Sequence, residues 1–262
     1  MPTKSTSPRL LPRLAAVTVA LFALAASAKD HTIPSYIVGV DGLAELASGP
    51  FAGRPNPNHQ RLTFLMAHTY PDAPGRNHYH SIGRLVYQEG EPGTEPTIRV
   101  NPANHVPEGS VPPLRLLPAP AGPLQGRLIS LPDYHPEDDE YDYAFLTVVE
   151  VDQLAGQPAG SPRDVLLNSS NGRWRGSVRA ADIVLELVDL TPGLNVADAD
   201  GRSLFTAPGD RQRLGSTFTF SPVFWAAAEA APGRYTARFR LRDANGNFAD
   251  SGEFEFRFQV AP

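Results

Sequence analysis

The chain of 262 residues has no cysteine. It can therefore form no disulfide, offer no thiolate to a metal ion, and carry neither a cysteine nucleophile nor a lipid-modified cysteine. Lysine is almost missing too, since it occurs only at Lys4 and Lys29. The common catalytic motifs are also lacking: there is no Gly-x-Ser-x-Gly elbow, no His-Glu-x-x-His pair and no phosphate-binding glycine loop. We therefore do not expect an enzyme.

Long apolar runs are limited to one short stretch near the start of the chain. A basic segment precedes the apolar run Leu14–Ala25, and the small residues Ala26-Ser27-Ala28 follow it. This pattern predicts that residues 1–28 are a signal peptide, cleaved after Ala28. Because twin arginines are absent, we expect export by general secretion. No later stretch reaches the ~20 apolar residues that a membrane-spanning helix needs. We expect a periplasmic or secreted protein without a membrane span.

The charge balance is acidic. The chain has 23 basic and 28 acidic residues, a net charge of −5. Residues 1–28 hold three of the basic residues and none of the acidic ones, so the remainder has a net charge of −8. A negative surface disfavours nucleic acid and anionic membranes as partners, and it suits a cationic ligand.

The pattern of the remaining residues predicts short strands. The 27 prolines and 22 glycines are spread along the chain and argue against long helices. The best helical candidate, Phe224–Ala231, makes at most two turns before Pro232-Gly233 stops it. Alternating apolar and polar residues predict six strands: Arg61–His68, Ser81–Tyr87, Tyr143–Val151, Asp182–Val188, Arg234–Arg242 and Phe254–Val260.

These patterns predict an all-β protein with two β-rich lobes. The last two predicted strands read as an antiparallel hairpin with one wet face, joined through Asp243–Asn247. Turn residues spaced along residues 161–262 favour an immunoglobulin-like antiparallel sandwich there. We place the boundary in Gly156–Pro162, so that residues 29–160 form a separate β-rich domain.

The metal prediction rests on a cluster of histidines. Three of the seven histidines, His68, His78 and His80, lie in one short segment. His78 and His80 are two residues apart, so on a strand their side chains leave the same face. The segment Thr69–Asn77 fits a hairpin loop, which would bring His68 beside them. Imidazole nitrogens are the usual ligands of Zn²⁺ and Cu²⁺ where thiolates are missing, so we predict a transition-metal site.

A closed tetrahedral site needs a fourth ligand. His135 is the leading candidate, because it lies in a loop-like segment with many carboxylates. The acidic run Glu137–Glu140 beside it is typical of a solvated loop, although it could also bind Ca²⁺. His31, His59 and His105 are weaker candidates for metal ligands, since a single histidine is more often a structural residue.

Two other classes of protein remain as alternatives. The His-x-His motif invites comparison with cupin metalloenzymes, but the glycine and glutamate of the cupin motif are replaced by Asp72 and by Arg84 or Leu85. Trp174, Trp225 and the tyrosines could instead form the stacking platform of a carbohydrate- or protein-binding adhesion module, although core packing is the more usual role of such residues.

A further likeness is carried by four stretches: Tyr36–Asp41, Phe51–Pro71, Asn77–Gly83 and Val106–Ser110. With these, and more loosely with His135, the chain resembles a family of exported bacterial proteins associated with the zinc-uptake repressor regulon. The segment Pro232–Val260 is similar to β-domains of surface-anchored proteins found beside metal-ion transporters. The chain departs from the anchored members because it stops at Pro262, so we do not expect attachment to the cell surface.

The resemblance implies a role in zinc homeostasis. It implies that the protein captures Zn²⁺ in the periplasm under zinc limitation and passes it to a metal ABC importer or its binding protein. The matching ligand positions are His68, His78 and His80, with His135 placed less closely. Affinity order alone favours Cu²⁺ at a histidine site, so the choice of zinc rests on the resemblance.

Overall fold

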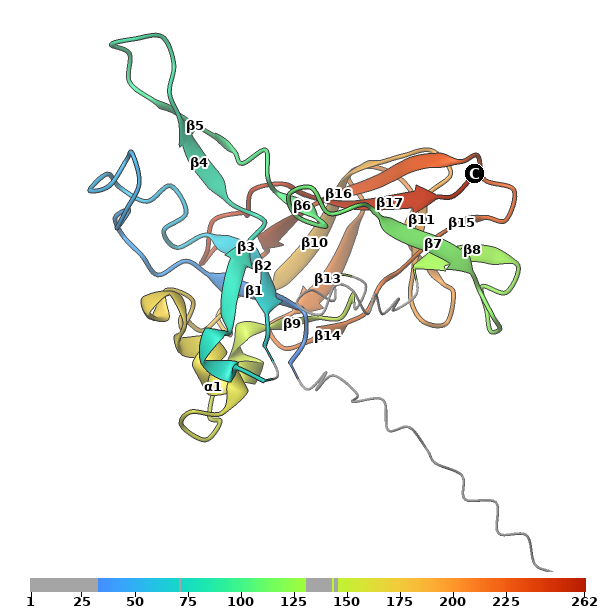
Figure 1. Cartoon of the computed structure of the whole chain (residues 1–262), viewed down its shortest axis with the longest axis horizontal. Helices are drawn as coiled ribbons and strands as arrows, with labels where there is room; N and C mark the ends of the chain where they lie inside the picture. Colours follow the sequence, from blue (N-terminus) through green and yellow to red (C-terminus); the bar gives the residue numbers. More distant parts are fainter. Residues whose placement is uncertain (1–32, 71, 131–142, 144–145) are drawn as a thin grey trace, which may run out of the picture.

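The chain is all-β, as predicted (Figure 1). The computed structural model describes residues 33–70, 72–130, 143 and 146–262. The strands are β1 (Tyr36–Val40), β2 (Leu62–His68), β3 (His78–Ser81), β4 (Leu85–Gln88), β5 (Thr97–Val100), β6 (His105–Val106), β7 (Leu114–Pro118), β8 (Arg127–Ser130), β9 (Val148–Glu150), β10 (Ile183–Leu190), β11 (Asn195–Ala197), β12 (Ser203–Phe205), β13 (Arg211–Gly215), β14 (Thr219–Phe220), β15 (Val223–Ala227), β16 (Gly233–Asp243) and β17 (Phe254–Val260).

Helical structure is brief. In the described residues it consists of the α-helix α1 (Pro162–Asn168) and the 3₁₀ turns η1 (Pro74–Arg76), η2 (Val151–Leu154) and η3 (Ser170–Gly172). None of the helices in the described ranges is long and apolar enough to cross a membrane. The predicted signal peptide, residues 1–28, lies outside the described residues.

The strands of the described residues form two large sheets and one separate hairpin. The first sheet has the order β14-β9-β1-β2-β3, and the second has the order β12-β11-β15-β8-β7-β17-β16-β10-β13, with β6 also paired to β17. Among the described strands, β4 and β5 pair with each other alone and project away from the two large sheets (Figure 1).

Both sheets contain strands from each side of residue 160. In the first sheet β14 pairs with β9. In the second, β6 and β7 lie parallel to β17, and β8 lies antiparallel to β15. One continuous apolar cluster also runs through both parts of the chain. The division into domains 29–160 and 161–262 stays a prediction, and the predicted sandwich shares its sheet with β6, β7 and β8.

The strand patterns succeed best at the C-terminal hairpin. The strand β17 has the predicted bounds, Phe254–Val260, and it pairs antiparallel with β16. The predicted helix Phe224–Ala231 is wrong. Its first part belongs to β15, which buries Phe224 and Ala226 in alternation and pairs with β8 on one side and β11 on the other.

The predicted strand Ser81–Tyr87 is broken in two. The amides of Ile82 and Gly83 both donate to the carbonyl oxygen of Phe64, at 2.8 and 3.1 Å, and β3 ends there. The Gly252 amide donates to the Gly83 carbonyl oxygen at 3.1 Å. A Cβ at Gly252 would lie 2.8 Å from the backbone oxygen of Arg84, so only glycine permits this close approach of two backbones.

An aromatic stack joins the two sheets. The ring of Phe64 on β2 lies parallel to that of Phe254 on β17, with centroids 4.2 Å apart, and Tyr36 on β1 stacks on Phe64 at 5.4 Å. Side chains alternate along a strand, so Met66 and His68 leave β2 on the same face as Phe64. The histidine therefore ends a row of buried core residues.

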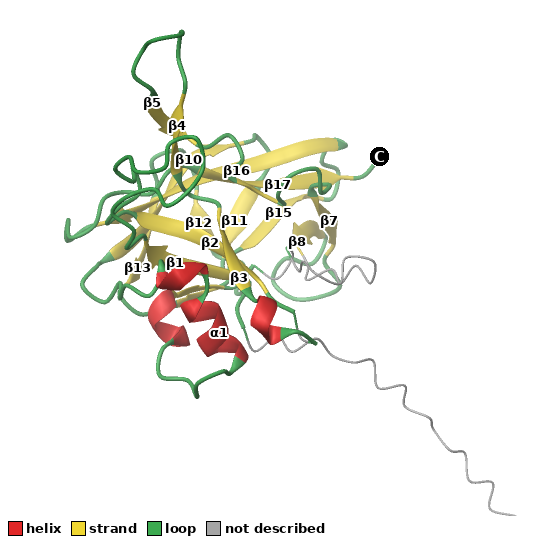
Figure 2. Ribbon diagram, turned by 60° about the vertical axis from the view of Figure 1, so that its left-hand side comes forward, coloured by secondary structure: helices red, strands yellow, loops and turns green. Residues whose placement is uncertain are grey.

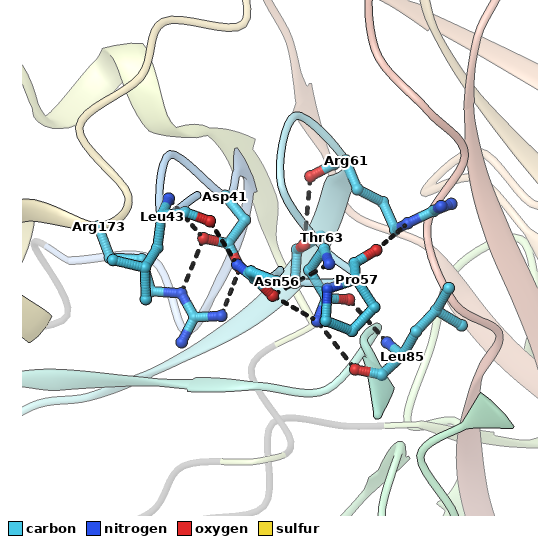
Figure 3. A network of polar contacts seen from close by, with 9 residues as sticks. Asp41, Leu43, Asn56, Pro57, Arg61, Thr63, Leu85 and Arg173 are labelled. Atoms are coloured by element: carbon cyan, nitrogen blue, oxygen red, sulfur yellow. Dashed lines mark hydrogen bonds and ion pairs between the residues drawn. The ribbon is translucent and has the colours of Figure 1, made fainter. Parts of the chain in front are cut away.

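A buried polar network fixes the connection between β1 and β2 (Figure 3). The carboxylate of Asp41 accepts two hydrogen bonds from the guanidinium of Arg173 and one from Asn56 at 2.9 Å. The side-chain amide of Asn58 bonds both the amide nitrogen and the carbonyl oxygen of Leu85, at 2.7 and 2.8 Å. Arg173 compensates for the buried charge of Asp41. The bonds of Asn58 hold the β1–β2 loop against Leu85, the first residue of β4.

A second charged cluster lies on β10. The carboxylate of Glu186 is almost fully buried and accepts hydrogen bonds from Arg211, Arg240 and Arg242 on the flanking strands. Burial alone would raise the pKa of Glu186, but the three guanidinium groups lower it to about 2. The cluster thus ties β10 to β13 and β16 through charge as well as through the backbone.

Replacing Gly252 by alanine should destabilise the fold, because the new Cβ would displace the backbone of Arg84. We expect the free energy of unfolding to fall by about 1–3 kcal/mol, the usual cost of overpacking. Denaturant unfolding of Gly252→Ala measures this. Gly75→Ala is the matched control, since a Cβ at Gly75 meets no atom within 4 Å. Equal losses in the two variants would contradict the packing argument.

Replacing Glu186 by glutamine should cost about 2 kcal/mol at pH 7, the scale of hydrogen bonds to charged groups. The pKa of this carboxyl is lower in the folded protein than its unfolded value of about 4.3, so its stabilisation is complete above that value. It is lost as the pH falls toward 2. Urea unfolding of both proteins between pH 7 and 2 should show their stabilities converging in acid. The exposed Glu229→Gln is the control, and a difference independent of pH would refute the assignment.

Candidate metal centre

The pairing of β2 with β3 brings the three predicted histidines together. The strands are antiparallel, with His68 opposite His78 and Met66 opposite His80. Residues opposite each other in such a pair share a face, as do residues two apart on one strand. One ligand atom from each of His68, His78 and His80 lies within 4.8 Å of the others. The predicted convergence of these side chains is confirmed.

Two of the ring nitrogens lie at the spacing of metal ligands. Nε2 of His78 is 3.1 Å from Nε2 of His80. Nitrogens that share one tetrahedral Zn²⁺ at about 2.0–2.1 Å are about 3.3 Å apart. The His68 ring lies over the His80 ring with centroids 3.7 Å apart, and it is 5.0 Å from the His78 ring. The His78–His80 pair is therefore close to the ligand spacing, and the ligand atom of His68 lies within 4.8 Å of both.

The other nitrogens of His78 and His80 determine where their protons lie. Nδ1 of His78 is 2.8 Å from the carbonyl oxygen of Arg76, and Nδ1 of His80 is 2.6 Å from Oε2 of Glu108. A carbonyl or carboxylate oxygen only accepts, so each Nδ1 carries a proton. With its proton on Nδ1, a neutral ring offers the lone pair of Nε2 to a cation. The two Nε2 atoms face each other at 3.1 Å, so a proton or a metal ion could lie between them.

Glu108 was not predicted as a site residue. Its Oε2 also lies 3.5 Å from Nε2 of His68, which is longer than a normal hydrogen bond but within ion-pair range. Burial would raise the pKa of Glu108, but the contacts with His68 and His80 lower it to about 2, so the group is a carboxylate near neutral pH. The stretch Val106–Ser110 carried part of the family resemblance, yet its composition gave no sign of a contact with the histidines.

Burial differs among the three histidines. His68 is 2% exposed, whereas His78 and His80 are partly exposed. Burial lowers the pKa of His68, against the opposing effect of Glu108, which favours the neutral imidazole that a metal ion requires. An ion at this centre would contact buried His68 on one side. It would exchange with solvent on the side of His78 and His80.

The hairpin loop is fixed by a buried asparagine. Oδ1 of Asn77 accepts from the amide of Tyr70 at 2.8 Å, and its side-chain amide donates to the carbonyl oxygen of Pro162 at 3.2 Å. The second contact fastens the loop to α1, which packs beside β3 and η1 (Figure 2). Above the loop, the Tyr70 ring stacks on His78 at 6.1 Å. The orientation of the His78 ring is thus set by the hydrogen bond to Arg76 and by the stacking of Tyr70.

The remaining histidine candidates are not brought to this cluster by the described chain. His135, the predicted fourth ligand, lies outside the described residues, as do His31 and the acidic run Glu137–Glu140. His135 therefore stays a prediction. His105 is buried and donates from Nδ1 to the carbonyl oxygen of Pro107 at 2.6 Å, which is a structural role. His59 is exposed and is not among the three convergent histidines.

The two tryptophans give little support to the alternative of an aromatic binding platform, because neither is an exposed side chain. Trp174 is 2% exposed and belongs to the core. Trp225 is partly buried, and the guanidinium of Arg127 lies 4.8 Å from its ring centroid. The exposed large apolar side chains of the described residues are instead Ile98 and Val100 on β5.

Comparison with known proteins identifies no relative of this chain. No protein-family model matches the sequence, and searches of curated proteins and of solved structures find no match. The predicted likeness to the zinc-uptake repressor family thus stays a prediction.

Proposed function

We propose that this protein binds one transition-metal ion through His68, His78 and His80. The observation that carries the proposal is the pair of Nε2 atoms 3.1 Å apart, with a third imidazole beside them. A shared proton would join only His78 and His80, whereas a metal ion could bind all three rings.

The donor set favours a borderline-soft divalent ion. Neutral imidazoles suit Zn²⁺ and Cu²⁺, and they suit Mg²⁺ or Ca²⁺ poorly because those ions prefer oxygen ligands. We propose zinc, on the strength of the family resemblance, with copper as the alternative. Three protein nitrogens leave one tetrahedral position, which His135 or a ligand from outside the chain would fill.

The proposed role is capture of zinc after export. The signal-like residues 1–28 and the acidic remainder of the chain support a periplasmic location and attraction of cations. In this proposal the protein collects Zn²⁺ under zinc limitation and passes it to a metal importer or its binding protein. Partial exposure of His78 and His80 supports such exchange, since an ion in a fully buried site would leave slowly.

Zinc titration by calorimetry should show one ion per chain for the wild type and a loss of about 100-fold or more in affinity for His78→Ala, since removing a direct ligand costs more than removing its support. His59→Ala is the matched control, because His59 is exposed and outside the cluster. Native mass spectrometry of protein taken from the periplasm would identify the bound metal. Wild-type protein that takes up neither zinc nor copper would refute the proposal.

Affinity for zinc should also depend on pH. Imidazoles must lose a proton to bind and have an ordinary pKa near 6.5, so we expect binding at pH 5.5 to be at least about tenfold weaker than at pH 7.5. Competition with a zinc-sensitive dye at the two pH values measures the ratio, with the dye calibrated at each. Equal affinities would contradict ligation by histidine.

A further inference from the structure

Glu108 is held in place by contacts on both sides of it in the chain. Before it, β6 lies parallel to β17, with His105 opposite Glu255 and Val106 opposite Phe256. The His105 ring donates to the carbonyl oxygen of Pro107 at 2.6 Å. After it, the amide of Val111 donates to the carbonyl oxygen of Glu108 at 3.2 Å and closes a turn. The carboxylate therefore projects from a rigid backbone.

The turn itself depends on a glycine at the next position. Gly109 has φ of +58°, a left-handed conformation that glycine adopts without strain. The side chain of Asn104 ties the start of the same loop to the carbonyl oxygens of Arg84 and Glu253, at 2.8 and 2.9 Å. Support of this extent around one partly exposed carboxylate points to a requirement for its position.

The direction of the contact excludes simple coordination. Oε2 of Glu108 lies 2.6 Å from Nδ1 of His80, while Nε2 of the same ring faces His78. The two nitrogens point away from each other across the imidazole. An ion on Nε2 would lie on the far side of the ring from the carboxylate, so Glu108 cannot coordinate that ion while it keeps this hydrogen bond.

We infer that Glu108 is the positioning residue of the metal centre: it holds the proton of His80 on Nδ1, presents Nε2 to the ion and adds a negative charge behind the ligand. This inference rests on the proposed function. Its physical basis is that an imidazole hydrogen-bonded to a carboxylate has one fixed tautomer and a more basic second nitrogen, which strengthens the bond to the metal.

His68 receives the same influence more weakly. Its Nε2 is 3.5 Å from the oxygen that His80 contacts, so one carboxylate oxygen serves both rings. His78 has a different support, the backbone carbonyl oxygen of Arg76 at 2.8 Å. Loss of Glu108 should therefore disturb His80 first, His68 to a smaller extent and His78 least.

The test compares Glu108→Gln with Glu108→Ala. The amide oxygen of glutamine can still accept from Nδ1 of His80 but carries no charge, whereas alanine removes both the acceptor and the charge. The exposed Glu89→Gln serves as the control for a change of net charge. Thermal unfolding of each protein identifies variants that fold poorly, and if Glu108→Ala fails to fold, the isosteric glutamine variant carries the test.

The first measurement uses the metal-free protein. Long-range ¹H–¹⁵N correlation spectra of the imidazoles should show His80 with its proton on Nδ1 in the wild type and in Glu108→Gln. In Glu108→Ala the proton should redistribute between the two nitrogens. A wild-type His80 protonated on Nε2 would overturn the inference, whether or not the protein binds a metal ion.

The second measurement is zinc affinity with X-ray absorption at the zinc edge. We expect a loss of 10- to 100-fold in Glu108→Ala, a smaller loss in Glu108→Gln, and the same number of zinc ligands in every variant that binds. Affinities equal to the wild type would refute the role of Glu108 alone. Loss of one oxygen ligand in Glu108→Gln would show direct coordination instead. A wild type that binds no zinc would refute the proposed function, while the spectra of the metal-free protein still decide the tautomer.

Discussion

The register between β2 and β3 is the constraint on which the rest of the site depends, and Phe64 sets it. Its ring is fixed by stacking on Phe254, and its carbonyl oxygen accepts the two amides at which β3 ends. With those bonds in place, His68 stands opposite His78. A slip of one residue would turn His78 and His80 to the other face of the sheet, away from His68. An interaction within the apolar core therefore determines whether the polar cluster exists.

The structure repeatedly secures polar groups by surrounding a carboxylate with donors. Asp41 receives Arg173 and Asn56, and Glu186 receives three arginines. Each of these clusters fastens segments that lie far apart in the sequence. The contact of Glu108 with His80 follows the same physical rule for a partly buried carboxylate, because donors compensate for the water that burial removes. It differs because its donors have a second nitrogen that faces outward from the carboxylate.

Sequence patterns predicted those strands and contacts that depend on neighbouring residues in the sequence. Alternation located β2, β10, β16 and β17, and the spacing of His78 and His80 with a loop before them predicted their meeting with His68. The patterns gave wrong or missing predictions where contacts with distant parts of the chain determine the structure. The run of alanines after Phe224 favours a helix, but this segment pairs as β15 with β8 and β11. Glu108 could not be found in the same way, since contacts with distant parts of the chain, such as the pairing of β6 with β17, bring it to the histidines. The helix α1 did have a local signal, Ser161-Pro162 followed by Asp164, whose amide is capped by the serine.

The position of β17 has a consequence for the order of assembly. This strand lies inside the large sheet, between β7 and β16, and it also receives β6. The strand that pairs with β6 beside Glu108 and one of the two rings that stack on Phe64, that of Phe254, both belong to β17, more than half the chain away from the histidines. Contacts of such long sequence separation form late and fold slowly. A chain that lacked β17 would contain all three histidines but neither the ring of Phe254 on Phe64 nor the partner strand of β6, so the surroundings of the histidine cluster depend on a strand from the other end of the sequence.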